Sequence, residues 1–301
     1  MTRRKADLAL ALNTLLWGAT FVLNKAALSH ISPVLFLALR FTLAALVLAL
    51  AMRGLAPNLR AGISMTASGL RDSVLPGVMA GLFLFAGFFL QTEGLRLTTP
   101  PKSAFLTGLC TVMVPFLAML VYKTRPQVSE VVGVLVATLG MGLMTLEGSI
   151  GSISRGDVLT LLGAIAFAGH IVTLGHFSKR VSFELLSITQ VGAAALAALS
   201  LVWWVETPRI EWQPVVVWAI LIAGLLCTAL AFTIQAWAQR FTTSTRTALI
   251  YALEPVVAWI TSFVIAGEGL AGRAAIGAAL ILAGVLLVET KPLGSMAHPK
   301  E

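Results

Sequence analysis

Residues 215–238 read VVVWAILIAGLLCTALAFTIQAWA and contain no Asp, Glu, Lys or Arg. At 1.5 Å per residue, a helix of this length crosses the roughly 30 Å hydrocarbon core of a bilayer. The rest of the 301-residue chain is similar, with 58% hydrophobic residues, 11% charged residues and a mean hydropathy of +0.92. A soluble domain typically has about 25% charged residues. The composition therefore predicts an all-α polytopic membrane protein, and it excludes a soluble enzyme or a nucleic-acid binder.

Ten apolar runs have the length of a membrane-spanning helix, and the connections between them are short. The first run is too long for the apolar region of a cleavable signal peptide. The two cysteines lie inside apolar runs and show no metal-binding spacing, so no metal or other cofactor is expected. The ten predicted spans are residues 8–29, 33–52, 74–95, 103–122, 128–145, 158–177, 185–205, 215–238, 247–266 and 270–288.

The distribution of positive charge predicts the orientation of these spans. With the N-terminus in the cytoplasm, 14 of the 21 Lys and Arg residues lie on the inner side and 5 on the outer side. Inner loops of membrane proteins are enriched in Lys and Arg. We therefore expect an integral protein of the cell (inner) membrane with both termini in the cytoplasm.

The second half of the chain repeats features of the first. Pro115 and Pro255 lie within the fourth and ninth predicted spans, and a Gly-x6-Gly pattern follows in the fifth and tenth. These features divide the chain into two five-helix repeats, residues 6–148 and 154–290. Because five is odd, the second repeat enters the membrane from the opposite side, and such inverted repeats are typical of alternating-access transporters. A duplication retained only for packing is the alternative.

The order of the short motifs resembles that of EamA-type permeases, ten-helix members of the drug/metabolite transporter superfamily. That resemblance implies a secondary transporter that moves small metabolites, amino acids or drug-like compounds, most often by export. The first half departs from the second, because it has Val114 where the second half has Glu254. The motifs are Trp17-Gly18-x-x-Phe21 with Lys25, Leu39-Arg40-Phe41, Ser103-Ala104-Phe105-Leu106-Thr107 with Pro115, Ala229-x5-Gln235, Leu253-Glu254-Pro255, Gly267-Glu268 and Gly277-x6-Gly284.

Two ionisable residues are predicted to lie deep in the membrane, where charge is costly and usually functional. Glu254 is seven residues into its span, roughly 10 Å deep. It is a candidate for binding a cationic substrate or carrying a coupling proton, or for satisfying backbone groups that Pro255 leaves unpaired. His170 lies at a similar depth and is a second candidate proton site, with a hydrogen-bonded core histidine as the alternative.

Other residues within the spans are candidates for lining a substrate pathway. Trp17 is too deep for an interfacial belt, and a Trp face suits apolar, aromatic or cationic ligands. Asn13 and Gln235 offer uncharged hydrogen bonds, and Phe85 and Tyr251 add aromatic surface. The two repeated prolines named above are candidate helix breaks where a gate would bend.

A second group of charged residues is predicted near the outer face. Lys25, Arg40 and Glu93 lie toward the outer ends of the first three spans. One interpretation is that Lys25 snorkels to the interface and that Arg40 pairs with Glu93 to fix helix packing. The other is an extracellular gate that closes when the pair forms.

The expected partners are a small-molecule substrate, the lipid bilayer and a coupling proton, with no nucleic acid. No GxxxxGK[ST] loop for ATP is present, so transport would use an ion or substrate gradient or be uncoupled. A polytopic membrane enzyme acting on a lipid-like substrate is the alternative, although HExxH and GxSxG motifs are absent. A channel is a third reading, for which no repeated polar ring is visible.

Overall fold

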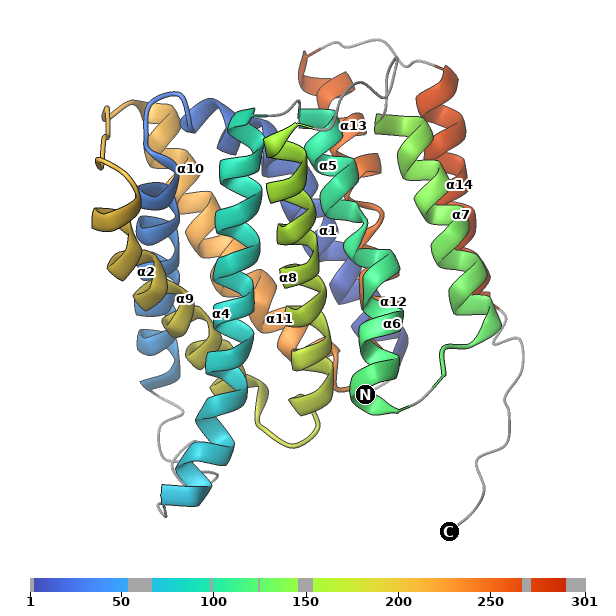
Figure 1. The fold of residues 1–301 in the computed structure, drawn as a ribbon, viewed down its shortest axis with the longest axis horizontal. Helices are drawn as coiled ribbons and strands as arrows, with labels where there is room; N and C mark the ends of the chain where they lie inside the picture. Colours follow the sequence, from blue (N-terminus) through green and yellow to red (C-terminus); the bar gives the residue numbers. More distant parts are fainter. Residues whose placement is uncertain are drawn as a thin grey trace.

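The computed structural model describes residues 3–53, 67–97, 100–123, 125–145, 154–266 and 272–290. Within these ranges the regular structure is helical, apart from one isolated antiparallel bridge between Ile31 and Ile210 (Figure 1). The Gly267-Glu268 motif, most of the long loop after the second predicted span and the C-terminal basic residues lie outside the described part of the chain.

The helices lie side by side with their axes roughly parallel or antiparallel, as Figure 1 shows. They are α1 (Arg3–Ala27), α2 (Pro33–Arg53), α4 (Ala67–Leu97), α5 (Pro100–Gly108), α6 (Cys110–Tyr122), α7 (Val128–Thr145), α8 (Arg155–Phe177), α9 (Phe183–Val205), α10 (Pro214–Gly224), the π-helix η1 (Leu225–Leu230), α11 (Ala231–Ala238), α12 (Ser244–Tyr251), α13 (Glu254–Ala266) and α14 (Gly272–Thr290).

Seven helical stretches of the described chain are long and apolar enough to cross a membrane. Two further apolar helices, Val128–Leu143 and Gly272–Val288, are shorter. The predicted span 247–266 is divided between α12 and α13, and neither part alone has the length to cross. The prediction of an all-helical membrane protein is confirmed, while the number of ten spans stays a prediction. The seven stretches are Arg3–Ala27, Pro33–Ala51, Asp72–Leu97, Phe105–Tyr122, Arg155–Phe177, Phe183–Val205 and Pro214–Ala238.

The helix breaks lie before the two repeated prolines rather than at them. Pro115 is buried inside α6, and the break falls six residues earlier at Leu109. Pro255 is the second residue of α13, and the break lies just before Glu254. A proline ring clashes with the carbonyl four residues back and removes a hydrogen bond toward it. For Pro255 that residue is Tyr251, the last of α12, whereas for Pro115 it is Thr111, which already lies inside α6. The first turn of a helix, by contrast, accommodates proline.

Paired glycines bring α7 and α14 into close contact at one edge of the molecule (Figure 1). A Cβ atom added to Gly284 would lie 2.6 Å from the carbonyl oxygen of Gly133. One added to Gly140 would lie 2.5 Å from the carbonyl oxygen of Gly277. Only glycine allows backbones this close. The Gly-x6-Gly pattern of one helix therefore packs, antiparallel, against the same pattern of the other.

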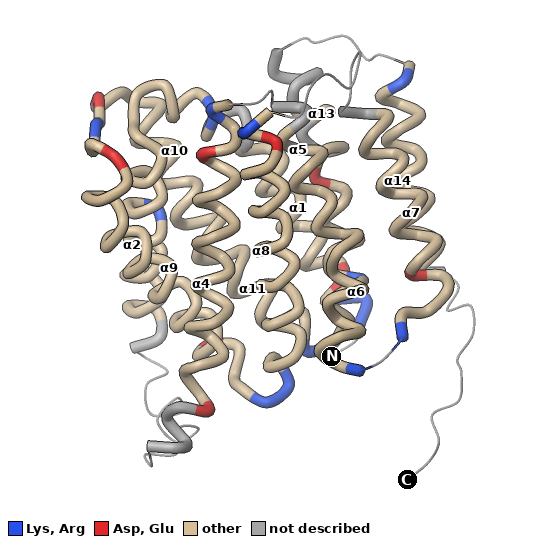
Figure 2. The backbone as a smooth tube through the Cα atoms, viewed as in Figure 1, with Lys and Arg blue, Asp and Glu red and all other residues tan. Residues whose placement is uncertain are grey.

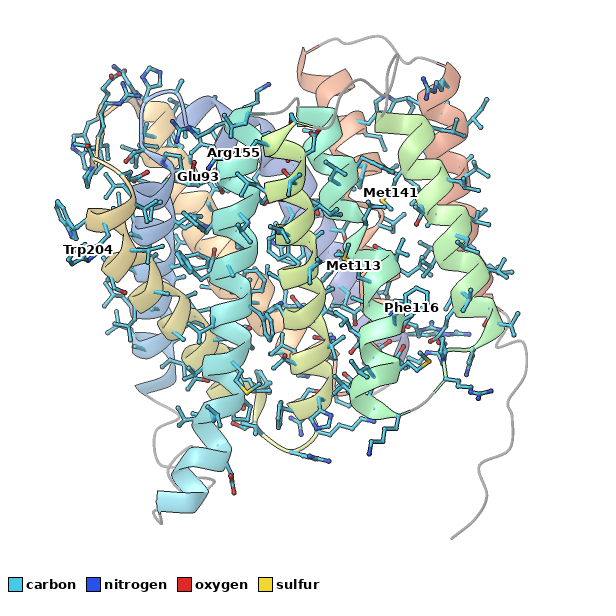
Figure 3. The ribbon with its side chains drawn as sticks, in the orientation of Figure 1. Glu93, Met113, Phe116, Met141, Arg155 and Trp204 are labelled. Atoms are coloured by element: carbon cyan, nitrogen blue, oxygen red, sulfur yellow. The ribbon has the colours of Figure 1, made fainter. Side chains whose placement is uncertain are left out.

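Large apolar side chains cover the outward surface, as expected for a protein surrounded by lipid. Figure 3 shows Trp204 pointing away from the bundle; this side chain is 88% exposed, and Phe116 is 59% exposed. A contiguous exposed apolar surface of this kind marks contact with a membrane rather than water. Most charged residues lie toward the two ends of the backbone tube (Figure 2).

Candidate functional site

The centre of α1 contacts helices from the second half of the chain. The Asn13 side-chain amide donates to the carbonyl oxygen of Ala231 at 2.7 Å and to the Tyr251 hydroxyl at 3.4 Å. The Trp17 indole Nε1–H donates to the carbonyl oxygen of Cys227 at 2.9 Å. Its ring packs edge-on against the Tyr251 ring, with 4.8 Å between centroids. Three of the predicted pathway residues, Asn13, Trp17 and Tyr251, therefore lie together.

Phe232 of α11 extends this group toward α8 and α9. Its ring centroid is 5.5 Å from that of Trp17 on one side and 5.5 Å from that of His170 on the other. We call Asn13, Trp17, Phe232 and Tyr251 the central cluster. These are normal separations for favourable aromatic pairs. The cluster joins α1 to α11 and α12 within the bundle.

His170 is a hydrogen-bonded, buried residue on the far side of Phe232. It is 2% exposed, and its Nε2 atom lies 2.8 Å from Oε1 of Gln190 in α9. The Gln190 amide in turn reaches the carbonyl oxygen of Phe232 at 3.4 Å. Buried polar groups of this kind are expected to be paired. The geometry matches the core-histidine interpretation, and Phe232 lies between His170 and Trp17.

Glu254 lies beside the central cluster, at the break between α12 and α13. Tyr251, the cluster residue at the end of α12, is only three residues before Glu254, the first residue of α13. The first turn of α13 holds it, where the helix dipole favours a negative charge. A Cβ atom on Gly18 of α1 would lie 3.0 Å from the Glu254 carbonyl oxygen, so α1 passes directly against this turn.

The Glu254 carboxyl group accepts no hydrogen bond from the described residues. The two N–H groups just before it are paired within the backbone, because Ala252 N–H donates to Ala248 O and Leu253 N–H donates to Ile250 O. The side chain is partly buried rather than sealed off. This arrangement leaves the carboxyl group available to a ligand or a proton.

The two remaining pathway candidates lie outside the central cluster. The Gln235 amide, which is buried in α11, donates to Oε1 of Gln239 at 3.4 Å. Phe85 of α4 is buried and stacks on Phe89, with 5.8 Å between ring centroids. Each of these contacts joins residues four apart along the chain.

The outer residues Lys25, Arg40 and Glu93 do not form one group. Glu93 pairs with Arg96 one turn along α4, at 3.1 Å. Arg40 is buried and donates to the Thr228 hydroxyl, while Lys25 is exposed at the end of α1. The predicted Arg40–Glu93 pair is wrong for this structure, because Glu93 has a partner in its own helix and Arg40 faces η1.

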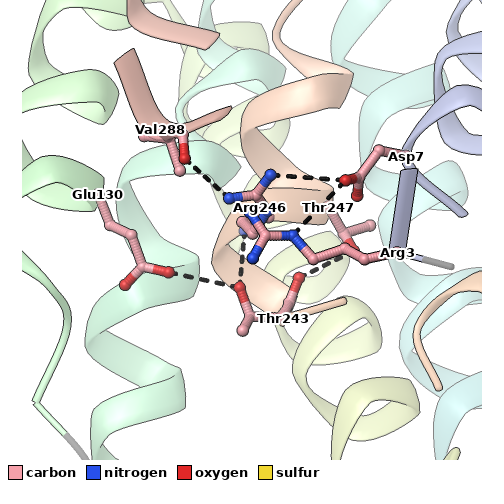
Figure 4. Close-up of polar contacts among 7 residues, drawn as sticks. All are labelled: Arg3, Asp7, Glu130, Thr243, Arg246, Thr247 and Val288. Carbon is pink, nitrogen blue, oxygen red and sulfur yellow. Dashed lines mark hydrogen bonds and ion pairs between the residues drawn. The ribbon is translucent and has the colours of Figure 1, made fainter. Parts of the chain in front are cut away.

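A polar cluster joins the first turns of α1 to α7, α12 and α14 (Figure 4). The Arg246 guanidinium donates to the carbonyl oxygen of Val288 at 2.8 Å and reaches Asp7 Oδ2 at 3.5 Å. Thr243 caps α12 and donates to Glu130 Oε1 at 3.4 Å. The charge count of the sequence places Arg246 among the inner loops, whereas the structure buries it between α1, α12 and α14.

Several site residues were not predicted from the sequence. Gln190 was detectable in principle, because an amide within an apolar helix usually has a partner. Phe232 and Thr228 carry no such signal, since aromatic and hydroxyl residues are common in membrane helices. The π-helix η1, which presents the Cys227 carbonyl to Trp17, has no sequence signature in this chain, although such segments often occur at functional sites. Among the described residues, no group of three His, Cys, Asp or Glu side chains is arranged to hold a metal ion.

Comparison with known proteins identifies the class of protein that this fold and sequence define. The chain matches the EamA-like transporter family twice, over residues 4–146 and 154–290. It therefore belongs to the EamA-like transporter family, and it is an integral membrane protein. The family resemblance of its motifs is confirmed.

The similar proteins include two relatives described as uncharacterized transporters. One, from Archaeoglobus fulgidus, is 32% identical over 290 residues, which cover 96% of this chain and 87% of the relative. Another, YyaM from Bacillus subtilis, is 30% identical over 279 residues, which cover 89% of this chain and 88% of the relative. One crystal structure of a protein is similar to this chain in fold, with a TM-score of 0.76 and 22% sequence identity. The match covers 95% of this chain and 97% of the other.

Proposed function

We propose that this protein is a secondary transporter of the cell membrane, and that it moves small metabolites, amino acids or drug-like compounds, by export, through alternating access. The observation that carries the proposal is the position of Glu254, a carboxyl group without a hydrogen bond from the described residues. It lies beside a cluster that both halves of the chain build, with α1 from the first and α11 and α12 from the second.

Two inverted five-helix repeats are part of this proposal, and the helix contacts support them. If the two halves are exchanged, the first predicted span takes the place of the sixth, and the third that of the eighth. The contact between α4 and α8 then corresponds to the contact of α1 with α10 and α11, and both contacts occur. In the same way, the contact between α1 and α13 corresponds to the contact between α5 and α8. The contact between α7 and α14 corresponds to itself, with glycines of one helix against glycines of the other. In addition, α1 starts at the end marked N in Figure 1, whereas α8 starts at the opposite end, where Figure 3 labels Arg155.

The proposed topology has ten spans and both termini in the cytoplasm. The start of α1 and the ends of α6 and α8 lie at one end of the bundle, and basic residues occur at all three (Figure 2). They include Arg3, Lys123 and Arg180. Short loops at the cytoplasmic face are typically enriched in Lys and Arg. The inner polar contacts of Figure 4 would then close the cytoplasmic side in this conformation.

In this proposal Glu254 binds a cationic group of the substrate or carries the coupling proton. A carboxyl group inside a membrane protein is costly to retain, and such residues mark substrate and proton routes. Trp17 and Tyr251 offer aromatic surface directly beside it, which suits an apolar or cationic ligand. His170 stays a prediction as a second proton site, with Gln190 as its present partner.

The test is counterflow in proteoliposomes with a panel of amino acids, nucleobases, quaternary amines and lysolipids. We expect saturable exchange of one class, strongly reduced in Glu254→Gln at an unchanged unfolding temperature. Glu211→Gln is the matched control, because Glu211 lies in the exposed loop between α9 and α10 and should leave transport unaffected. Full activity of Glu254→Gln would remove this residue from the site. Absence of flux for every compound, from folded protein, would contradict the carrier assignment for these classes and favour a membrane enzyme.

A further inference from the structure

Arg40 carries a positive charge that the described protein does not neutralise. The residue is 3% exposed and lies in the middle of α2. Its only hydrogen-bond acceptor among the described residues is the Thr228 hydroxyl, which lies 3.2 Å from Nε and 2.9 Å from Nη2. A guanidinium has five N–H groups, so three of them find no acceptor there. No carboxylate of the described chain forms an ion pair with it.

The local structure holds this cation in place. The Thr228 hydroxyl donates to the carbonyl oxygen of Ala223, five residues earlier, which is the spacing of the π-helix η1. Its lone pairs therefore point toward Arg40. On the other side, the Phe88 ring of α4 lies 4.5 Å from the guanidinium carbon, and Phe41 lies 5.5 Å from it. Aromatic faces attract a cation but leave its N–H groups unsatisfied.

Arg40 is connected to the central cluster through a continuous row of rings. Phe88, which lies against the guanidinium, is 6.2 Å from Phe232, and Phe232 is 5.5 Å from Trp17. Cys227, next to Thr228 in η1, accepts a hydrogen bond from the Trp17 indole at its carbonyl oxygen. Arg40 and the central cluster thus contact neighbouring residues of η1.

An open pocket of about 280 Å³ lies at the outer end of the same helix pair. Pro33 at the start of α2 is part of its lining, together with Arg96 and Arg209. Arg40 follows Pro33 by seven residues, which places it roughly 10 Å deeper along the helix. Arg40 itself is not part of the pocket lining, which includes the Glu206 carboxylate.

We infer that Arg40 is a subsite for an anionic group, and that the substrate class is a carboxylate joined to an apolar or aromatic body. The planar guanidinium fork matches a carboxylate through two parallel hydrogen bonds. The three unused N–H groups provide the donors for it. Phe88, Phe232 and Trp17 provide the surface for the apolar body. This inference rests on the proposed transport function, because it names the substrate of the same site.

Ligand-induced stabilisation of the purified protein in detergent tests this inference without requiring transport. The probes are 3-phenylpropionate, 3-phenylpropanol and 3-phenylpropylamine, which share one body and differ in head-group charge, together with hexanoate as an aliphatic carboxylate. A ligand that binds only the folded state raises the unfolding temperature with concentration. We expect a saturable rise with the carboxylates and none with the alcohol or the amine.

Variants then assign the effect to one residue. Arg40→Gln should weaken carboxylate binding by about 30-fold or more, the lower end of the loss on removing one buried charged partner. Arg40→Lys keeps the charge but loses the fork, and should bind with intermediate affinity. Arg180→Gln is the matched control, because Arg180 is exposed in the turn after α8 and contacts His176, and it should bind like the wild type.

The outcomes separate this inference from the proposed function. If Arg40→Gln does not fold, two measurements still test the anionic subsite. They are the preference of the wild type for carboxylates over the alcohol and the amine, and the carboxylate affinity of Arg40→Lys. Equal responses to acid, alcohol and amine would overturn the inference, and so would no response to any carboxylate. Undiminished binding by folded Arg40→Gln would do the same. Counterflow of a cationic or neutral compound, unaffected by Arg40→Gln, would keep the transporter and refute the anionic subsite.

Discussion

Substituting Gly284 by Ala tests the contact between the two halves at the α7–α14 seam. The new Cβ atom would lie 2.6 Å from the Gly133 carbonyl oxygen and 3.2 Å from the Ala137 Cβ atom. Carbon–oxygen contacts of this type settle at about 3.3–3.6 Å. The backbones must therefore separate by roughly 0.7–1.0 Å at this point.

The separation has a predictable cost. Moving packed atoms apart by about 0.5–1 Å forfeits roughly a quarter to a half of their dispersion attraction. Overpacking of this kind typically destabilises a protein by about 1–3 kcal/mol. The higher helix propensity of Ala offsets up to about 1 kcal/mol of this. A control with the same propensity change is therefore necessary.

Gly192→Ala provides that control, because a Cβ atom there would meet no atom within 4 Å. Both variants are compared with the wild type by reversible unfolding in mixed detergent micelles, followed by circular dichroism. We expect Gly284→Ala to be less stable than Gly192→Ala by about 1–3 kcal/mol. The Gly133→Ala/Gly284→Ala double variant should lose less than the sum of the single variants, because the first substitution already separates the helices. Equal stability of the two single variants would refute a tight glycine seam.

Two further predictions concern single side chains. Trp17→Phe keeps an aromatic ring but leaves the Cys227 carbonyl oxygen without its hydrogen-bond donor. We therefore expect the unfolding free energy to fall by about 1–3 kcal/mol and transport to be slower. Unchanged stability would contradict the hydrogen bond. The Nδ1 atom of His30 lies 2.9 Å from Oε2 of Glu211, and this hydrogen bond lowers the pKa of the Glu211 carboxyl from its usual 4.5. The contact therefore stabilises the folded protein above pH 4.5, and this stabilisation is lost as the pH falls through the lowered pKa. The unfolding temperatures of wild type and Glu211→Gln should therefore converge at low pH, and a constant difference would refute this contact.

Much of the fold follows from hydrophobic run lengths. Each predicted span has an observed helix within it, because burial of every backbone polar group in a bilayer leaves helices as the main solution. The exact break points do not follow in the same way. Pro115 and Pro255 indicate that two helices are interrupted. The break lies one to two turns before Pro115, whereas the other break ends at Glu254, directly before Pro255. Their positions depend on how the neighbouring helices accommodate the freed carbonyl groups.

The candidate site was predicted only in part. Trp17, Asn13 and Tyr251 stood out as polar or aromatic residues in apolar runs, and the structure brings them together. The expected Arg40–Glu93 pair rested on similar depth alone. Depth along a helix does not specify which face a side chain occupies, so Arg40 contacts η1 and Glu93 bonds within its own helix.

The sequence by itself determined that this chain is a helical membrane protein of the EamA-like family with repeated halves, because apolar run length, charge bias and motif order are local properties of the chain. Only the tertiary structure decided which side chains share an environment. The ring of Phe232 between Trp17 and His170 and the glycine seam of α7 and α14 arise from contacts between residues far apart in sequence. Side-chain direction is set by helix rotation and packing, which a linear pattern does not encode.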